Sequence, residues 1–326
     1  MCANSSGKTC TIQAKKCARI RAEKRARFKS KIAYAIKSYI NGTNLSKFIK
    51  RRRNETLVHL FNTFHTQKIN VFFDESGKGK QRPNLLGALS IPQKVYGCDD
   101  FKYMNWFLKR QKLNIHWKNY NGSKLDKSNI QNLIEIFVLY KDYIKLNIIN
   151  YHDGFLSSQP LFNQNDLNAT IYSKLPERLI YGLIRGYGSE ATVSADIYID
   201  KATEYKRMKL NETLVTDLNS QSLYRGEKFI ANKCEMLPKN TEVGLELTDV
   251  LLGMIRTIIL NPKINEKTGN STKAKVFLTV ELLENEEVKK ILSSIKYYEW
   301  RGHKQLTQIN FEDYIFSFLL VHQFKI

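Results

Sequence analysis

Carboxylate side chains stand at the ends of apolar runs in distant parts of this sequence. The first is Asp74, which follows the apolar run 69–73 and precedes Glu75 and the turn residue Gly77. A charge at the end of a buried strand is costly unless a cation neutralises it. Because successive strand residues point to opposite faces, only one of the two acids faces a shared site, and we favour Asp74. Glu75 reaches the same site only if the glycine turn begins early.

Two further carboxylate positions occur in the second half of the chain. Asp200 ends a short apolar run, and Glu246 and Asp249 lie within the apolar segment 243–260. On a helix, residues spaced three apart share one face, so Glu246 and Asp249 are expected to point the same way. Gly253, one turn beyond Asp249, is expected to let another segment or a ligand approach closely.

Converging carboxylates are the ligands that Mg²⁺ and Mn²⁺ prefer, since both are hard cations. Two such ions held close together activate a water and stabilise the leaving oxygen of a phosphodiester. We therefore predict a divalent-metal site at Asp74, Asp200 and Asp249. Glu75 and Glu246 are further catalytic candidates. The predicted chemistry is metal-dependent hydrolysis of RNA or DNA.

Each of these residues also has an ordinary structural interpretation. A lone aspartate after a strand is usually a turn residue, and Asp196 competes with Asp200 on the same strand face. A Glu/Asp pair on a helix usually faces solvent, although the segment 243–260 has no obvious polar stripe. His116, beside a tryptophan, could assist catalysis or stack a base, but a partly buried structural pair explains it more simply. Lys239 could steer phosphate, but a loop lysine needs no special explanation.

The elements that must position these acids alternate between strands and helices. Strands are expected at 69–73, 85–91, 144–151, 195–199 and 228–234. Helices are expected at 100–109, 126–143, 167–186 with a break at Pro176, 202–219, 242–260, 281–297 and 311–324. Three early strands followed by alternating strands and helices predict an α/β fold. The specific expectation is a ribonuclease-H-like mixed sheet flanked by helices.

Positive charge dominates the composition and is concentrated at the amino terminus. The formal net charge is +21, and residues 1–66 contain 16 Lys and Arg against two acids. Such a segment is expected to bind the nucleic-acid backbone without reading bases. A solvated helix and membrane-surface binding are the alternatives. The candidate phosphate-binding residues are Lys24, Arg25, Arg27, Arg51, Arg52 and Arg53.

Three parts of the chain are expected. They are a basic helical arm at 1–66, a ribonuclease-H-like domain at 67–262 and a helical C-terminal extension at 263–326. No apolar run is long enough for a transmembrane helix, and the first residues contain no apolar leader, so we expect a cytoplasmic protein without a membrane partner. Five scattered cysteines are consistent with a reducing compartment. A mitochondrial presequence is the alternative explanation of the arm.

The motifs together resemble a known family. Asp-Glu-Ser-Gly at 74–77 and Leu-Glu-Leu-Thr-Asp-Val-Leu-Leu-Gly at 245–253 are similar to two motifs of the bacterial DUF3800 family. The resemblance spans about residues 69–260. It implies a ribonuclease-H-like fold and a metal-dependent nuclease of mobile elements or phage defence. It also implies that the three aspartates named above are metal ligands.

Two departures from the family pattern matter. The relatives usually have Gln at the position of Glu246, and they often carry Glu-Ile-Lys-Trp where this chain has Asn-Ile-His-Trp at 114–117. One acidic ligand is then missing, which leaves open whether a two-metal site is complete. The alternative interpretation is a catalytically inactive nucleic-acid-binding subunit of a larger ribonucleoprotein or defence complex.

Overall fold

The computed structural model describes most of the chain beyond residue 65. The described residues are 66–78, 82–111, 115–152, 163–187, 191–301 and 305–322. His65–Ile326 form one compact unit. The predicted basic arm lies outside the described residues except for its last residue, and so does Asn114. The phosphate-binding candidates that therefore also lie outside them are Lys24, Arg25, Arg27, Arg51, Arg52 and Arg53.

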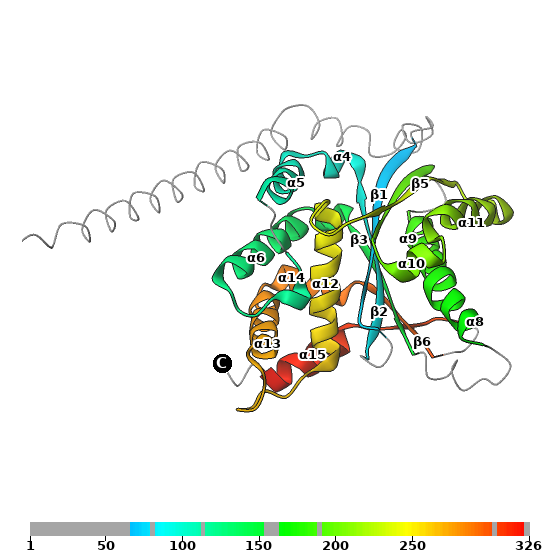
Figure 1. Ribbon diagram of the computed structural model, residues 1–326. Helices are drawn as coiled ribbons and strands as arrows, with labels where there is room; N and C mark the ends of the chain where they lie inside the picture. The colour runs from blue at the N-terminus through cyan, green and yellow to red at the C-terminus, as the bar shows by residue number, and fades with distance from the viewer. Residues whose placement is uncertain are drawn as a thin grey trace, which may run out of the picture. The chain divides into compact units, whose positions relative to one another are not determined.

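A seven-stranded mixed sheet forms the centre of the compact unit (Figure 1). Its strands are β1 (Gln67–Ser76), β2 (Asn84–Pro92), β3 (Lys145–Tyr151), β4 (Val193–Asp200), β5 (Phe229–Leu237), β6 (Lys296–Trp300) and β7 (Thr307–Ile309). Their order across the sheet is β5-β4-β1-β2-β3-β6-β7. β1, β2 and β3 are antiparallel neighbours, β4 runs parallel to β1, and β5 runs parallel to β4. The predicted α/β class with a mixed sheet is confirmed.

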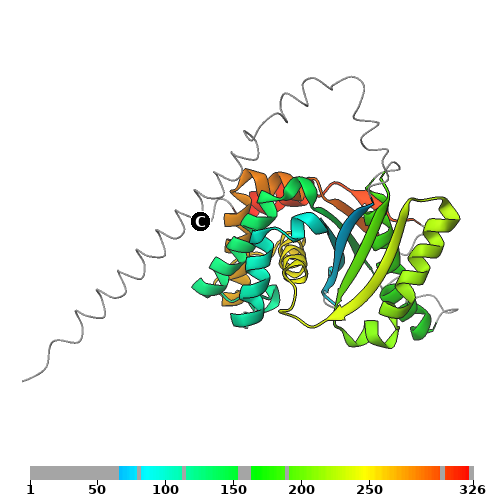
Figure 2. The ribbon, with the colours of Figure 1, turned by 90° about the horizontal axis from the view of Figure 1, so that it is seen from above.

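Helices cover both faces of the sheet (Figure 2). The first layer contains α4 (Gln93–Tyr96), α5 (Asp99–Gln111), α6 (Lys124–Leu139), α12 (Val243–Leu260), α13 (Asn270–Leu283), α14 (Glu286–Ser293) and α15 (Glu312–His322). The second contains α8 (Gln164–Ala169), α9 (Leu175–Arg185), α10 (Thr203–Arg207) and α11 (Leu210–Arg225). β1 is apolar on both sides because Phe72 faces the first layer while Val71 and Phe73 face the second.

The α12 helix is the central element of the first layer and is buried on nearly every side. Two glycines allow this close packing. A Cβ atom on Gly244 would come within 2.3 Å of the Phe72 ring, and one on Gly253 within 2.1 Å of Trp117. The expectation that Gly253 admits another chain segment is therefore confirmed, and that segment is the short 3-10 helix Trp117–Asn119. Apolar residues on all sides of α12 explain the missing polar stripe.

The break expected at Pro176 is smaller than predicted. A five-residue π-helix, Thr170–Lys174, joins α8 to α9, and Pro176 lies in the first turn of α9. Proline has no backbone N–H to donate, and the wider π-helical turn just before it accommodates the missing hydrogen bond without ending the helix. The helical path from 164 to 185 is therefore continuous but widened just before the proline.

The segment after residue 262 is not purely helical, which corrects the expected helical extension. The predicted helix at 281–297 is in fact the end of α13, the whole of α14 and the start of β6. β6 pairs in parallel with β3, and β7 pairs with β6. Tyr297 and Trp300 are buried, so the apolar spacing that suggested a helix belongs partly to a strand. No compact unit ends at 262.

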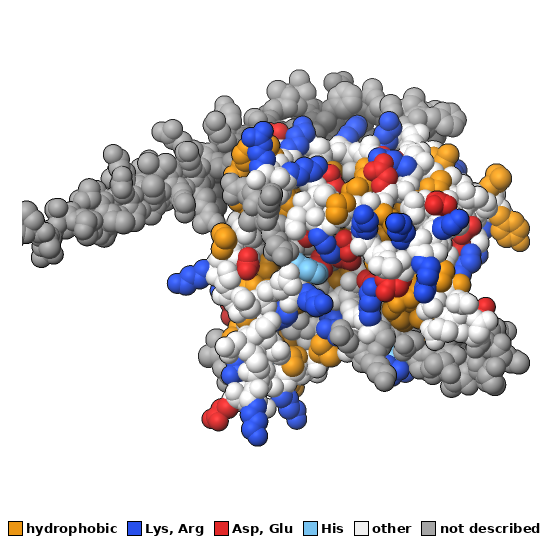
Figure 3. Space-filling model, in the orientation of Figure 1, with side chains coloured by type: hydrophobic (Ala, Val, Ile, Leu, Met, Phe, Trp, Pro, Cys, Tyr) orange, Lys and Arg blue, Asp and Glu red, His pale blue; other side chains and the backbone are white. Residues whose placement is uncertain are grey.

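The surface of the described residues is mixed in charge. Figure 3 shows Lys and Arg side chains spread among acidic ones, with a His side chain beside acidic side chains near the middle of this face. Within the part of the chain that the structure describes, no helix combines the length and the apolar character required to cross a bilayer.

We expect Gly253→Ala to lower the free energy of unfolding. The added methyl group gains about 0.5–1 kcal/mol in helix propensity but overpacks Trp117, which costs about 1–3 kcal/mol. The steric cost is larger, so the net effect is a loss, measurable by urea denaturation. The matched control is Gly182→Ala in the interior of α9, where the nearest atom to an added Cβ is Asn147 Nδ2 at 3.8 Å. Equal stabilities of the two variants would show that Trp117 yields easily.

Candidate functional site

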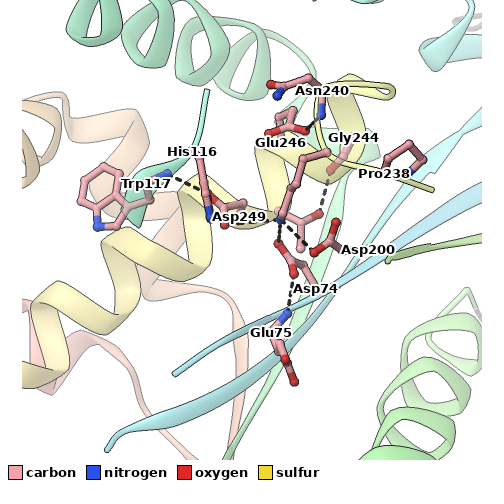
Figure 4. Close-up of polar contacts among 12 residues, drawn as sticks. Asp74, Glu75, His116, Trp117, Asp200, Pro238, Asn240, Gly244, Glu246 and Asp249 are labelled. Carbon is pink, nitrogen blue, oxygen red and sulfur yellow. Dashed lines mark hydrogen bonds and ion pairs between the residues drawn. The ribbon is translucent and has the colours of Figure 1, made fainter. Parts of the chain in front are cut away.

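Two of the predicted site residues stand side by side at the ends of neighbouring parallel strands. Phe73 on β1 is in register with Ile199 on β4, so Asp74 and Asp200 are the next residues of each strand. Strand alternation places both on the face covered by α12. Asp249 points toward them from α12 (Figure 4). The sequence therefore brings three distant carboxylates to one place.

A single ammonium group lies among these three carboxylates. The Nζ atom of Lys239 is 2.7 Å from Asp74 Oδ2, 3.2 Å from Asp200 Oδ2 and 3.6 Å from Asp249 Oδ1. Lys239 lies in the loop between β5 and α12, and 27% of its side chain is exposed. In the sequence, Lys239 carries only a weak signal, its position just before the acidic helix. Its central position was not predicted.

Burial and mutual repulsion shift the pKa values of the cluster. Burial raises the pKa of Asp74 well above its usual value; Lys239 opposes this shift, and the two neighbouring aspartates add to it. Burial also raises the pKa of Asp200 against the pull of Lys239. For Lys239, burial alone lowers the pKa, but the three carboxylates outweigh it and the net shift is upward. Lys239 is therefore charged.

Asp249 is held from its other side by the segment before α6. His116 Nδ1 and the backbone N–H of Trp117 both lie 2.7 Å from Asp249 Oδ2. Burial raises the pKa of Asp249, but the His116 hydrogen bond, the Lys239 charge and the Trp117 N–H together lower it below its usual value. His116 and Trp117 thus orient Asp249 and keep it ionised. His116 and Trp117 are therefore more than the structural pair expected from the sequence, because they also orient Asp249.

Glu246 shares the α12 face with Asp249 but serves the adjoining loop. Its Oε1 accepts a hydrogen bond of 2.5 Å from the Asn240 backbone N–H, and its buried Oε2 has no partner. Burial raises the pKa of Glu246 to about 7, against the opposing Asn240 hydrogen bond and Lys239 charge. Asn240 has a left-handed backbone with φ of 62°. Glu246 therefore fixes the loop that presents Lys239.

Glu75 and Asp196 lie outside the cluster. The Glu75 side chain points to the opposite face of the sheet, where it accepts a 2.7 Å hydrogen bond from the Tyr205 hydroxyl and pairs with Lys78. Only its backbone N–H contacts the site, donating to Asp74 Oδ1 at 2.8 Å. Asp196 shares the strand face of Asp200 but accepts hydrogen bonds from Gln93 and Asn232 instead.

The donor chemistry of the cluster fits a hard cation. Three carboxylates converge, and the buried Oδ1 of Asp200 has no hydrogen-bond partner. In the described part of the chain, however, no group of three or more His, Cys, Asp or Glu side chains has the arrangement of a metal site. The cation that the aspartates share is the Lys239 ammonium. A divalent ion would have to replace it.

The sequence matches no protein-family model, and a search of curated proteins gives no match.

We expect Lys239→Met to lower the free energy of unfolding by about 3 kcal/mol, because three clustered carboxylates, two of them buried, lose their common partner. Adding Asp74→Asn to this variant is expected to restore part of the loss, since one of the unpaired charges is then removed. Urea denaturation in the presence of a chelator measures both effects. Lys233→Met, which removes an exposed pair with Glu235, is the matched control and is expected to cost less than about 1 kcal/mol. Equal losses for Lys239→Met and Lys233→Met would contradict the assigned role of the ammonium.

Glu246→Gln is expected to change how stability depends on pH. The pKa of Glu246 is about 7 in the folded protein and near 4.5 when exposed, so the unfolded state loses its proton first. Between these values, rising pH destabilises the wild type by up to about 3 kcal/mol. The variant lacks this loss, so its stability relative to wild type is expected to increase from pH 5 to pH 8. Urea denaturation at both pH values tests this, with the exposed Glu235→Gln as control; parallel behaviour of wild type and Glu246→Gln would disprove it.

Proposed function

We propose that this chain is a metal-dependent nuclease that binds Mg²⁺ or Mn²⁺ through Asp74, Asp200 and Asp249. The observation that carries this proposal is the convergence of the three carboxylates on one cationic group. Collecting three acids in a buried position is electrostatically unfavourable, and strongly shifted pKa values of this kind cluster at functional sites. A set of carboxylate oxygens of this kind selects hard divalent cations.

The strand order supports a ribonuclease-H-like fold as part of the proposal. Three antiparallel strands come first, and two parallel strands then extend the sheet on the other side of β1. The acids stand on β1, on β4 and on the helix after β5, all facing the same layer. The resemblance to the DUF3800 family rests on its two motifs alone, because no family model matches. The proposal therefore depends on the geometry of the site.

Lys239 sets how the site would work. Its ammonium holds the three carboxylates together, and its side chain is exposed enough to turn toward solvent. In that position it would meet an incoming phosphate as a compact positive charge. A divalent ion bound among the aspartates would supply the activation of water and the stabilisation of the leaving oxygen. His116 and Trp117 would keep Asp249 ionised and oriented throughout.

A second candidate function is a catalytically silent nucleic-acid-binding subunit of a larger ribonucleoprotein or defence complex. The observation that favours it is the same lysine, because an ammonium that stays in place would satisfy the carboxylates without a metal. His116 beside Asp249, where the resembled family often carries a lysine, is a further departure. In both proposals the basic arm would supply salt-sensitive affinity for the phosphate backbone.

Asp74→Asn and Asp249→Asn are each expected to abolish cleavage while leaving nucleic-acid affinity largely unchanged. Each variant removes one carboxylate ligand and leaves the rest of the surface intact. Cleavage is measured on single-stranded, duplex and hybrid substrates with Mg²⁺, Mn²⁺ or chelator. Thermal unfolding with and without Mn²⁺ gives a second readout, because an ion that binds the folded state raises the midpoint in wild type but not in the variants.

Asp196→Asn is the matched control for this experiment. Asp196 lies on the same strand face as Asp200, but its hydrogen bonds go to Gln93 and Asn232, so full cleavage and a full Mn²⁺ shift are expected. Cleavage that survives in both Asp74→Asn and Asp249→Asn would reject the nuclease site. Tight binding with no cleavage and no Mn²⁺ shift in the wild type would favour the silent subunit.

A further inference from the structure

The α5 helix carries two apolar faces, and the core uses only one of them. Phe101, Met104 and Leu108 form the first face and are buried against the first helical layer. The second face consists of Tyr103, Trp106, Phe107 and Arg110, spaced as one stripe along the helix. We call these four residues the α5 platform. Burial of the core therefore does not explain the aromatic residues of the platform.

The rings of the α5 platform are exposed and nearly parallel. Tyr103 and Trp106 are 58% and 48% exposed, while Phe107 is half-buried. The Tyr103 ring centroid lies 6.2 Å from that of Trp106 and 6.3 Å from that of Phe107, with interplanar angles of 20° and 10°. The Arg110 guanidinium lies 5.2 Å from the centroid of the Trp106 ring. Flat rings with a neighbouring guanidinium are the groups on which unpaired bases stack.

The α5 helix is fastened to the loop that presents Lys239 by residues outside the platform. Lys109 on α5 pairs with Glu242 at 2.9 Å, and Asn105 accepts a 2.8 Å hydrogen bond from the Val243 backbone N–H at the start of α12. The helix that bears the platform is thus fastened to the helix that bears Asp249.

The charge around the α5 platform suits a polyanion. Exposed cations on α4 and α5 are Lys94, Lys102, Lys109 and Arg110. Of these, Lys109 is paired with Glu242, and α5 begins with two acids, Asp99 and Asp100. Figure 3 shows Lys and Arg side chains together with hydrophobic ones over the part of the surface where Figure 1 places α5. Aromatic rings for bases and cations for phosphates on one helix match single-stranded nucleic acid, since duplex bases are already stacked on one another.

We propose that the α5 platform binds unpaired bases of a single-stranded nucleic acid. The role as a substrate site rests on the proposed nuclease function, whereas the binding itself does not. Trp106 and Tyr103 supply the stacking surfaces, and Arg110 contacts both a ring and the backbone. Because the platform binds unpaired bases, it favours single strands over duplexes. Single-stranded nucleic acid is therefore the proposed substrate class.

The test is the affinity of the full-length protein for fluorescein-labelled oligothymidine, oligouridine and a DNA duplex in the presence of chelator. Stacking one base on an aromatic side chain changes affinity by about 5- to 150-fold, so Trp106→Ala is expected to weaken single-strand binding by about tenfold. Trp106→Phe is expected to retain most of it, and duplex binding is expected to stay unchanged. Arg110→Ala is expected to reduce the slope of log affinity against log salt concentration by about 0.7 per lost phosphate contact. Trp106→Ala is expected to leave this slope unchanged.

Intrinsic fluorescence gives an independent readout. The chain contains three tryptophans, and Trp117 and Trp300 are buried, so quenching by unlabelled oligothymidine reports on Trp106. The matched control is Tyr224→Ala, which removes an 88% exposed ring on α11 in the other helical layer and is expected to leave binding unchanged. Equal losses for single strands and duplex, or no quenching of Trp106, would overturn the proposal. A change of oligomeric state in Trp106→Ala would also overturn it, because a second copy would then cover the platform.

These outcomes are separable from those of the proposed nuclease function. Binding to the platform is measured without metal. The platform proposal therefore stands even if Asp74→Asn and Asp249→Asn leave cleavage unaffected and the nuclease proposal fails. Conversely, the aspartate variants could lose cleavage while Trp106→Ala binds single strands as wild type does. That result would reject the platform proposal and support the nuclease site.

Discussion

An ammonium group shared by three carboxylates, two of them buried, is the constraint on which the centre of this molecule depends. Asp74 and Asp200 lie next to each other because β1 and β4 are parallel and in register, and Asp249 completes the group from α12. Without a cation, this register would force like charges together in a poorly solvated place. The packing of α12 on the sheet and the position of Lys239 are therefore parts of one arrangement.

The neighbours of the cluster are organised around the same constraint. Glu246 holds the backbone of the lysine loop through Asn240, and Glu242 at the end of that loop contacts Tyr96 and Lys109. With the loop backbone held at these points, movement of the cation is left mainly to the side chain of Lys239. Exchange between ammonium and a metal ion would then require rotation of a side chain and no rearrangement of the fold.

Much of the fold followed from the sequence, because the apolar runs of β1 to β5 and of α12 have clear lengths and boundaries. The three aspartates could be selected because each interrupts or ends such a run. Lys239 could not, since a loop lysine has no periodic signal and its role appears only when three remote segments meet. The sequence predicts a helix where β6 begins, because the aromatic residues around Tyr297 fit both the helical and the strand period over so short a segment. The direction of the Glu75 side chain followed from strand alternation alone.

The two C-terminal strands determine when the sheet can be finished. β3 is an almost fully buried strand, and one of its edges is covered only by β6, which follows α12, α13 and α14 in the chain. During synthesis, this edge stays without its neighbour until residue 300 has left the ribosome. An apolar strand with an open edge readily pairs with another chain. The growing polypeptide is therefore prone to pair with other chains during one interval of its synthesis. This interval begins once the candidate catalytic residues have been synthesised and ends when β6 pairs with β3.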